Sequence, residues 1–314
     1  MIIFLGIPCT FLYNILAALI RSLGDSKTPV IFLALASVLN IGLDLVFIIV
    51  FRMGVKGAAL ATVLAQGISG LCCLWYIGKR FPILRGTKEE WKPLPKYMIR
   101  LCAVGIPMGM QYSITAIGTL VIQAAVNGFG STVVAGVTAA TKLGNFVSCP
   151  IEALGQTMAP YVGQNMGAGN TERAKKTFHY SLKMCTFFLL ILGFIFSRRP
   201  VSQTMVSFFS TDAKVIPLAA DYLSIIAFWC FTNAFYNVSQ GLFQGCGHTL
   251  ITMLVDASRI WLFRLLSLWI CANVFHMGVA SVWYSVVISN GTSAIILYLL
   301  YWTGIWKKGY ADPL

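Results

Sequence analysis

The stretch FRMGVKGAAL at residues 51–60 has a partial copy, FHMGVASVWY, at residues 275–284. The two glycines of the shared F-x-M-G-V pattern, Gly54 and Gly278, are 224 residues apart. Further matches occur at this interval or at one residue less; the earlier members are Phe51, Met53, Gly54, Val55, Gly67, Ser69, Tyr13, Asn14, Leu19 and Gly24, and the later members are Phe275, Met277, Gly278, Val279, Gly291, Ser293, Tyr236, Asn237, Leu242 and Gly247. So many matches at a nearly constant interval indicate that the chain contains two copies of one unit.

The composition is that of a membrane protein. Of the 314 residues, 58% are hydrophobic and only 11% are charged, and the mean hydropathy is +0.78. Soluble domains carry about 25% charged residues. Apolar runs near or above the roughly 20 residues that cross a bilayer recur along the chain. They predict an all-α, polytopic membrane protein of about nine transmembrane helices, at residues 2–20, 28–51, 55–78, 101–127, 132–160, 176–197, 215–243, 249–275 and 278–304.

Two finer predictions concern the shape and packing of these helices. Pro150 lies inside the long fifth span and is expected to break or kink it, because proline removes a backbone hydrogen bond. Small residues four positions apart let helix backbones approach closely. Close packing is therefore predicted at three pairs of glycines, Gly105 and Gly109, Gly163 and Gly167, and Gly241 and Gly245.

The duplicated unit contains six spans. Spans one to three resemble spans seven to nine, and an even separation gives both copies the same orientation in the membrane. Parallel repeats of this kind occur in secondary transporters. Two complete units need twelve spans, so we expect three more spans before Met1 and an incomplete first lobe. The predicted domains are residues 1–79, the second half of the N-terminal lobe; 80–100, a basic cytoplasmic linker; 101–305, a six-helix C-terminal lobe; and 306–314, a cytoplasmic tail.

The basic residues predict the orientation of the chain. The net charge is +13, and 15 of the 23 lysines and arginines flank or follow the odd-numbered spans, whereas five lie on the other side. By the positive-inside rule the odd-numbered loops and the C-terminus face the cytoplasm. The start of the chain is then outside, which fits three preceding spans. The basic excess therefore indicates a multi-pass protein of the cytoplasmic membrane, embedded in the lipid bilayer, and not a partner of nucleic acid.

No motif in the sequence predicts an enzyme. The nine cysteines are scattered, with no C-x-x-C pair or Cys/His cluster, so neither disulfides nor a zinc site is indicated. There is no P-loop and hence no ATP drive, and no nucleophile stands near a base. We expect no cofactor and no catalytic residue.

Asp44 is the sharpest candidate for function. Ionisable residues inside spans cost about 2.5–3.5 kcal/mol on insertion scales and mark functional sites. No cation lies three or four residues from Asp44, whereas Asn40 lies one turn away on the same helix face. A carboxylate in this setting holds either a proton or a metal cation, and Na⁺ at Asn40 and Asp44 is the metal candidate. The alternative is a structural aspartate paired with an arginine of another helix.

Asp256 has a different sequence environment. Arg259 follows three residues later, so a local salt bridge is the simpler interpretation. The Asn40–Asp44 pair has no counterpart near Arg264 in the second copy. We therefore expect the coupling site in the first lobe only.

Four stretches resemble the multidrug and toxic compound extrusion (MATE) family of efflux transporters. They are YNILAALIRSLGDSKTP at 13–29, SVLNIGLDLVF at 37–47, MGVKGAALATVLAQ at 53–66 and APYVGQNMGAGNTERAKK at 159–176. The likeness covers nearly the whole chain, aligned to the fourth through twelfth helices of the family.

The resemblance implies two six-helix lobes around a central cavity and secondary active efflux of amphiphilic, often cationic, small molecules by antiport of Na⁺ or H⁺. For one bacterial branch it implies a cation site at Asn14, Asn40, Asp44 and Thr62. That site also uses a first-helix aspartate, which lies outside this sequence, so the fragment alone is expected to be deficient in coupled transport. Other members carry a seventh-helix glutamate, where this chain has Gln111.

Substrate contacts are predicted at polar and aromatic positions of helices expected to line the cavity. Aromatic faces attract organic cations. These positions are Gln111, Tyr112, Tyr236 and Asn237. We expect the protein to work as a monomer.

Two rival functions remain open at this stage. A lipid-linked oligosaccharide flippase of similar architecture needs several cationic groups in its cavity, whereas the spans contain only Arg259, Arg264 and, less centrally, Lys142. A non-transporting membrane scaffold needs no acid beside an amide in one lobe.

Overall fold

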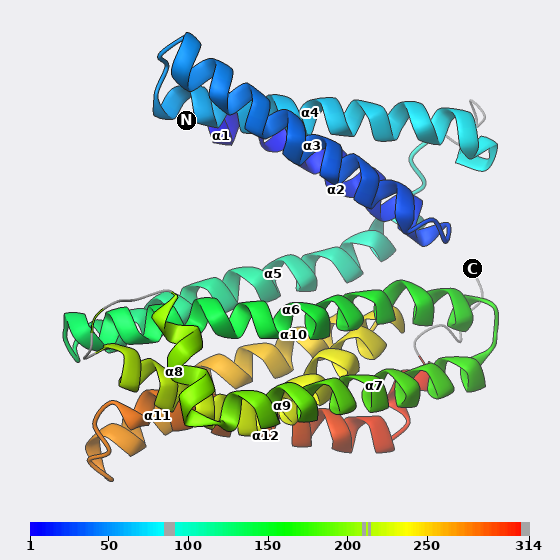
Figure 1. The fold of residues 1–314 in the computed structure, drawn as a ribbon. Coiled ribbons are helices and arrows are strands. Elements are labelled where there is room, and N and C mark those ends of the chain that lie inside the picture. The colour runs from blue at the N-terminus through cyan, green and yellow to red at the C-terminus, as the bar shows by residue number, and fades with distance from the viewer. Residues whose placement is uncertain (85–91, 209–211, 213–214, 309–314) are drawn as a thin grey trace. The chain divides into compact units, whose positions relative to one another are not determined.

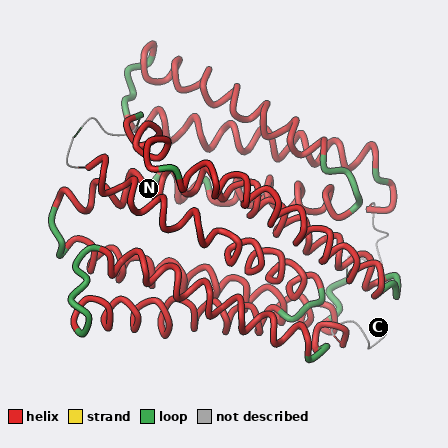
Figure 2. Tube along the Cα trace, turned by 60° about the horizontal axis from the view of Figure 1, so that its bottom comes forward, coloured by secondary structure: helices red, strands yellow, loops and turns green. Residues whose placement is uncertain are grey.

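The computed structural model consists of helices joined by short turns, with no strand among the described residues (Figures 1 and 2). The structure describes residues 1–84, 92–208, 212 and 215–308. Contacts divide the chain into two compact units, Met1–Pro95 and Lys96–Leu314, which we call unit 1 and unit 2.

Unit 1 contains three long helices that pack on one another. Its elements are α1 (Ile2–Leu5), α2 (Ile7–Ser22), α3 (Lys27–Leu45), the π-helical turn η1 (Val46–Val50), α4 (Val55–Arg80) and the 3-10 turn η2 (Pro82–Leu84). Both α2 and α3 pack against α4. A small core of Tyr13, Leu16, Ile20 and Cys73 holds α2 against α4.

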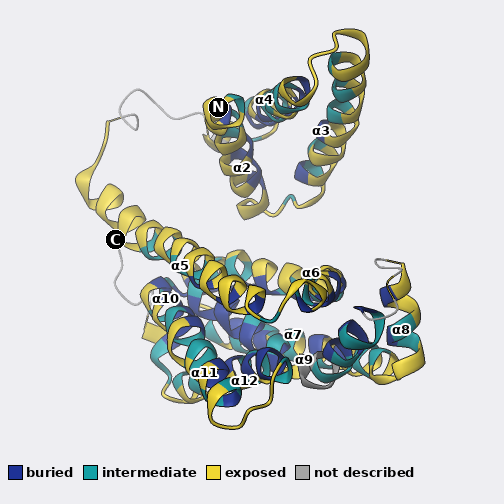
Figure 3. Cartoon of the chain, turned by 90° about the vertical axis from the view of Figure 1, so that its left-hand side faces the viewer, coloured by how far each residue is buried: buried dark blue, intermediate teal, exposed yellow. Residues whose placement is uncertain are grey.

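Unit 2 is built around α9. Its elements are α5 (Pro95–Asn127), α6 (Ser131–Gly167), α7 (Thr171–Ser197), α8 (Arg199–Ser207), α9 (Val215–Gly245), α10 (Thr249–Ala257), the π-helix η3 (Ser258–Arg264), α11 (Leu265–Asn273), α12 (Ala280–Trp302) and the 3-10 turn η4 (Ile305–Lys308). Helices α6, α7, α8 and α12 all pack on α9, which is accordingly among the most buried helices in Figure 3.

Every predicted span coincides with a helical segment, with two differences in detail. Helix α6 runs through Pro150 from Ser131 to Gly167, so the helix is not broken there. Helix α5 begins at Pro95, inside the predicted linker. Residues 85–91 of that linker and residues 309–314 of the predicted tail lie outside the described residues.

Helix α8 occupies a stretch that was expected to be a loop. The segment begins with basic residues, which are untypical of a membrane span, but it is amphipathic. Ser202 and Val206, one turn apart, are both buried. The Ser202 hydroxyl donates to the Phe196 carbonyl at the end of α7, and Arg199 forms an ion pair with Asp221 on α9 at 3.0 Å.

In the part of the chain that the structure describes, five helices are long and apolar enough to cross a membrane. They are Lys27–Val50, Val55–Arg80, Pro95–Asn127, Thr171–Ser197 and Ala280–Trp302. Large apolar side chains such as Ile31 and Val38 point outward from α3, with 63% and 68% of their surface exposed. In water such a surface would be costly, whereas lipid accommodates it.

The two copies of F-x-M-G-V adopt the same backbone conformation. Gly54 and Gly278 have φ angles of +54° and +57°, and the residues two positions earlier, Arg52 and His276, have φ angles of +52° and +50°. Positive φ is rare for non-glycine residues. Gly54, with ψ of −134°, lies in a region that other residues avoid. The shared pattern therefore encodes a shared turn.

The hydrogen bonds of the two turns also correspond. Met53 N donates to Phe47 O at 2.9 Å, and Met277 N donates to Cys271 O at 3.0 Å. Each bond spans six residues and closes the end of the preceding helix. This correspondence supports the duplication inferred from the sequence.

Close glycine packing occurs where the second half of α6 meets α9. A Cβ on Gly245 would lie 2.6 Å from the Ala159 carbonyl oxygen, and one on Gly241 would overlap the backbone of α6. The prediction for this pair is confirmed. The prediction for Gly105 and Gly109 was wrong, since nothing lies within 4 Å of either position.

Candidate functional site

The predicted polar pair of unit 1, Asn40 and Asp44, lies on the face of α3 that meets α4. Asn40 Nδ2 donates to Thr62 Oγ1 at 3.4 Å, and Thr62 in turn donates to Ala58 O at 3.0 Å. The i, i+4 spacing puts Asp44 one turn further along the same face of α3. Three of the predicted site residues, Asn40, Asp44 and Thr62, therefore come from one contact between two helices.

Asp44 has an unsatisfied oxygen. Its Oδ1 is buried and has no hydrogen-bond partner. Among the described residues the ion pairs are Arg199–Asp221 and Arg259–Asp256, and neither includes Asp44. A buried acceptor without a donor costs about 1–3 kcal/mol, and more when it is charged. Asp44 Oδ1 is thus an acceptor that no described donor satisfies.

The helix contact around Asp44 is close. A Cβ on Gly57 would lie 2.9 Å from Phe47 Cβ, so α4 approaches the π-helical turn that follows Asp44. The small residues Gly57 and Ala58 are therefore level with Asp44 on α4. The buried Oδ1 of Asp44 therefore lies close to a tight helix contact, while the residue as a whole is half-buried.

A residue that sequence reasoning missed lies one turn beyond Thr62. Gln66 Oε1 is buried and also lacks a hydrogen-bond partner. The signal was present, because Thr62 and Gln66 are four residues apart and share a face of α4. Unit 1 therefore presents two unsatisfied acceptor oxygens along one helix contact.

Asn14, the fourth predicted cation ligand, lies at a different level. A Cβ on Gly70 of α4 would lie 3.3 Å from Tyr13 N, so Asn14 is level with Gly70. Gly70 is eight residues beyond Thr62 on α4, which corresponds to about 12 Å along the helix. The side chain of Asn14 is exposed, and no described hydrogen bond joins it to Asn40 or Thr62.

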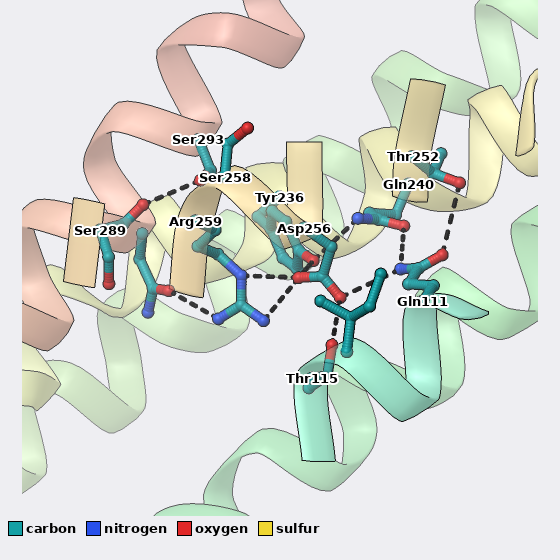
Figure 4. Close-up of polar contacts among 12 residues, drawn as sticks. Gln111, Thr115, Tyr236, Gln240, Thr252, Asp256, Ser258, Arg259, Ser289 and Ser293 are labelled. Atoms are coloured by element: carbon teal, nitrogen blue, oxygen red, sulfur yellow. Dashed lines mark hydrogen bonds and ion pairs between the residues drawn. The ribbon is translucent and has the colours of Figure 1, made fainter. Parts of the chain in front are cut away.

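Unit 2 contains a second polar cluster, centred on Asp256 of α10 (Figure 4). Tyr236 donates to Oδ1 at 2.5 Å. Arg259 donates to the same oxygen at 2.8 Å from Nε and 2.6 Å from Nη2. Thr115 and Gln111 of α5 donate to Oδ2 at 2.9 and 3.2 Å. The predicted salt bridge between Asp256 and Arg259 is confirmed, and the carboxylate has donors on both oxygens.

The cluster extends across unit 2 through amides. Gln240 donates to Tyr236 Oη at 2.8 Å and accepts from Gln111 at 3.2 Å. Arg259 lies over the Tyr236 ring at 4.8 Å and donates to Asn290 Oδ1 of α12 at 3.3 Å. Helices α5, α9, α10 and α12 are thereby tied to one buried ion pair.

The predicted substrate residues divide between this cluster and its surroundings. Gln111 and Tyr236 belong to the cluster. Tyr112 points away from it, with 71% of its surface exposed. Asn237 donates within its own helix, to Asn233.

The duplicated tyrosines illustrate how the two units have diverged. Tyr13 and Tyr236 occupy equivalent positions of the repeat. Tyr13 Oη donates to the Pro29 carbonyl at 3.0 Å, whereas Tyr236 donates to the Asp256 carboxylate. The tyrosine at this position of the repeat therefore donates to a backbone carbonyl in unit 1 and to the carboxylate of an ion pair in unit 2.

The two carboxylates consequently differ in what they can bind. Asp256 is neutralised by a guanidinium at 2.6 Å and saturated with donors. Asp44 has one unsatisfied oxygen beside an amide and a hydroxyl. Of the two, Asp44 has the arrangement suited to a reversible cation.

Two protein-family models match this chain. The family model described as MatE matches residues 107–270. The model described as "Lipid II flippase MurJ" matches residues 2–124.

Individual relatives and solved structures agree with the first match. The "Probable multidrug resistance protein YpnP" of Bacillus subtilis is 30% identical over 97% of this chain and 67% of the relative. The "Probable multidrug resistance protein NorM" of Thermotoga maritima is 24% identical over 94% of this chain and 64% of the relative. The structure described as "Crystal structure of MATE in the bent conformation" superposes with a TM-score of 0.89 at 21% identity, over 99% of this chain and 69% of that one. This chain thus spans about two thirds of the length of its relatives, and it belongs to the MATE family of multi-pass membrane transporters.

Proposed function

We propose that the protein of which this chain forms about two thirds is an antiporter of the cytoplasmic membrane. It expels amphiphilic, often cationic, small molecules in exchange for Na⁺ or H⁺. Membership of the MATE family supports this proposal, and the observation that carries it is the unsatisfied Oδ1 of Asp44. No cofactor is needed apart from the coupling ion, and the protein works as a monomer.

The coupling step takes place at Asp44. A proton on the carboxylate, or Na⁺ held by the oxygens of Asp44, Asn40 and Thr62, removes the cost of the buried charge. Ion binding then favours whichever packing of α3 and α4 brings these oxygens together. An ion shifts such an equilibrium only through its different affinities for the two conformations.

The substrate is proposed to contact Gln111, Tyr112, Tyr236 and Asn237. Tyr112 is the member with a free aromatic face, which can attract an organic cation. Asn14 is proposed to contact the ion or substrate from α2, apart from Asn40 and Thr62.

The topology is part of the proposal. The chain crosses the membrane nine times, and its C-terminus lies in the cytoplasm. Residues 1–79 form the second half of a first lobe, and residues 101–305 form a complete second lobe. The intervening residues 80–100 form a basic cytoplasmic linker, and residues 306–314 form the tail. The matching turns at Gly54 and Gly278 support a parallel repeat.

Sodium binding to the purified chain tests the assignment without requiring transport. Radioactive ²²Na⁺ binding is measured for the unmodified chain and for Asp44→Asn at pH 8 in detergent. Loss of binding in Asp44→Asn, with displacement of Na⁺ from the unmodified chain at low pH, is the expected result. Asp221→Asn is the matched control, since Asp221 lies in an exposed ion pair with Arg199.

Efflux of rhodamine 6G from cells lacking their own pumps provides the second readout, made in the full-length protein. Asp44→Asn should abolish efflux while membrane expression is kept. Unimpaired efflux in that variant would show that another group couples the ion.

A second candidate function is flipping of a lipid-linked oligosaccharide. The match of the lipid II flippase model to residues 2–124 favours it. Its weakness is the small number of cationic groups, because Arg259 is paired with Asp256 and the spans otherwise contain only Arg264 and, less centrally, Lys142. Translocation of fluorescent lipid II in vesicles, measured beside dye efflux, separates the two candidates. A non-transporting scaffold would give neither activity and no ion flux.

A further inference from the structure

Arg264 of unit 2 belongs to neither of the ion pairs among the described residues. It ends the π-helix η3, and its Nε is buried without a hydrogen-bond partner, although the residue as a whole is half-buried. A buried charged donor without an acceptor is unfavourable. The unsatisfied Nε therefore favours binding of an acceptor at this position.

Two acids of unit 2 are already engaged. Asp256, two helical turns before Arg264, is held by Arg259 at 2.6 Å. Asp221 is paired with Arg199 at the exposed surface of α8 and α9. Neither of these two carboxylates is therefore available to Arg264.

The surroundings of Arg264 are apolar and aromatic. Ile260 and Leu268, one turn before and after it, belong to a buried cluster that also contains Tyr222 of α9 and Trp283 of α12. The rings of Tyr222 and Trp283 are 6.1 Å apart. This environment has a low dielectric, so an anion placed there would be held strongly.

A second unsatisfied donor belongs to the same cluster. Trp283 Nε1 is buried and has no hydrogen-bond partner. An indole N–H can only donate, and so can a guanidinium. Trp283 thus belongs to the same cluster as Ile260 and Leu268, the residues four positions before and after Arg264, and both donors would be satisfied by an acceptor, preferably a negatively charged one. Carboxylates and phosphates match the planar fork of arginine.

We propose that Arg264 and Trp283 form a binding site for the carboxylate or phosphate group of an amphiphilic anion. The apolar residues around them take the hydrophobic part of the same molecule. Arg264 lies 224 residues after Asn40, so the two residues occupy equivalent positions of the repeat. The repeat therefore supports a cation site in unit 1 and an anion site in unit 2 at equivalent positions. The inference goes beyond the proposed function, because it concerns anion binding to unit 2 and requires neither ion coupling nor transport.

A pair of dyes with one ring system and opposite charge tests the site. Fluorescein is anionic and rhodamine 6G is cationic, and binding of each to the purified chain in phosphatidylcholine nanodiscs is followed by fluorescence anisotropy. Arg264→Gln should weaken fluorescein binding at least about tenfold, the effect of losing a charge-assisted hydrogen bond, and leave rhodamine 6G unchanged. Arg264→Lys should restore part of the loss, and Trp283→Phe should weaken fluorescein binding about threefold.

Two further arms identify the source of the anion and control for charge. Arg198→Gln removes the same charge at the end of α7, where Arg198 stacks on Phe194, and should bind both dyes normally. Nanodiscs with phosphatidylglycerol show whether a lipid headgroup competes with fluorescein. Competition that depends on Arg264 supports a lipid phosphate as the occupant, and its absence supports a dissolved anion.

The proposal is overturned if Arg264→Gln and the unmodified chain bind fluorescein equally, or if neither fluorescein nor phosphatidylglycerol shows binding that depends on Arg264. Rhodamine 6G binding reports that the variants are folded. Because Asp44 is unchanged in every variant, failure of the anion site and failure of the coupling site give different results.

Discussion

Replacing Arg259 by glutamine should destabilise the protein more than any change at an exposed ion pair. The structure places the Asp256 carboxylate in the interior, with side chains of Arg259 and Asp256 only 17% and 7% exposed. Without the guanidinium, the carboxylate retains neutral donors from Tyr236, Thr115 and Gln111 but no positive charge. Removing one partner of a buried pair costs about 3–5 kcal/mol. We expect a loss of this size in the free energy of unfolding.

The assay is denaturation by SDS in mixed micelles, followed by circular dichroism, on a double-mutant cycle. Asp256→Asn alone also destabilises, because it leaves the buried guanidinium with Asn290 as an acceptor. The double variant Asp256→Asn with Arg259→Gln removes both charges and should recover much of the loss, as paired neutral groups do. Arg199→Gln is the matched control, since its pair with Asp221 is 63% and 42% exposed and is worth about 1 kcal/mol at most.

Two results would refute the reasoning. A loss below about 1 kcal/mol for Arg259→Gln would mean that water or another donor already compensates Asp256. Additive losses in the double variant would mean that the two charges do not interact.

Three other predictions use the same denaturation assay. Gly245→Ala should cost about 1–3 kcal/mol of stability through overpacking, because its Cβ would lie 2.6 Å from a carbonyl oxygen of α6. The control Gly109→Ala should be neutral or stabilising, since nothing lies within 4 Å of that position. Equal effects of the two variants would argue against the α6–α9 contact. Gly54→Ala should cost of order 1–3 kcal/mol through backbone strain alone, since its φ is +54° and its ψ is −134°; no loss would show that the turn differs. The Thr28 hydroxyl holds the pKa of Asp25 below its usual value through a 2.7 Å hydrogen bond. The contribution of the Asp25 carboxylate to stability is therefore present above pH of about 4 and is lost as the pH falls below that value. Asp25→Asn should remove this part of the acid sensitivity, and an unchanged pH profile of stability in this variant would contradict the prediction.

Much of the helical framework followed from local sequence. Apolar runs near the length of a bilayer crossing marked every span. Gly54 and Gly278 marked the duplicated turn, because glycine adopts positive φ angles more readily than other residues. Helix α8 escaped prediction because it is only nine residues long and begins with a charged residue, Arg199. Pro150 does not break α6, because a long helix that packs on α9 tolerates an internal proline.

The candidate site was predictable only in part. Asn40 and Asp44 were recognisable as a pair because both lie on one helix face, and Arg259 was recognisable as a partner of Asp256 for the same reason. Gln66 and Trp283 were not recognised, since amides and indoles are common in spans and nothing local reveals an unsatisfied atom.

The sequence alone determined the helices, their repeated turns and the neutral or charged character of each span, since these depend on residues a few positions apart. Only the tertiary structure decided which polar atoms find partners. Asp256 is saturated by side chains from three other elements, whereas Asp44 and Arg264 are left with unsatisfied atoms. The physical reason is that the cost of a buried charge depends on every group that surrounds it, and most of those groups come from distant parts of the chain.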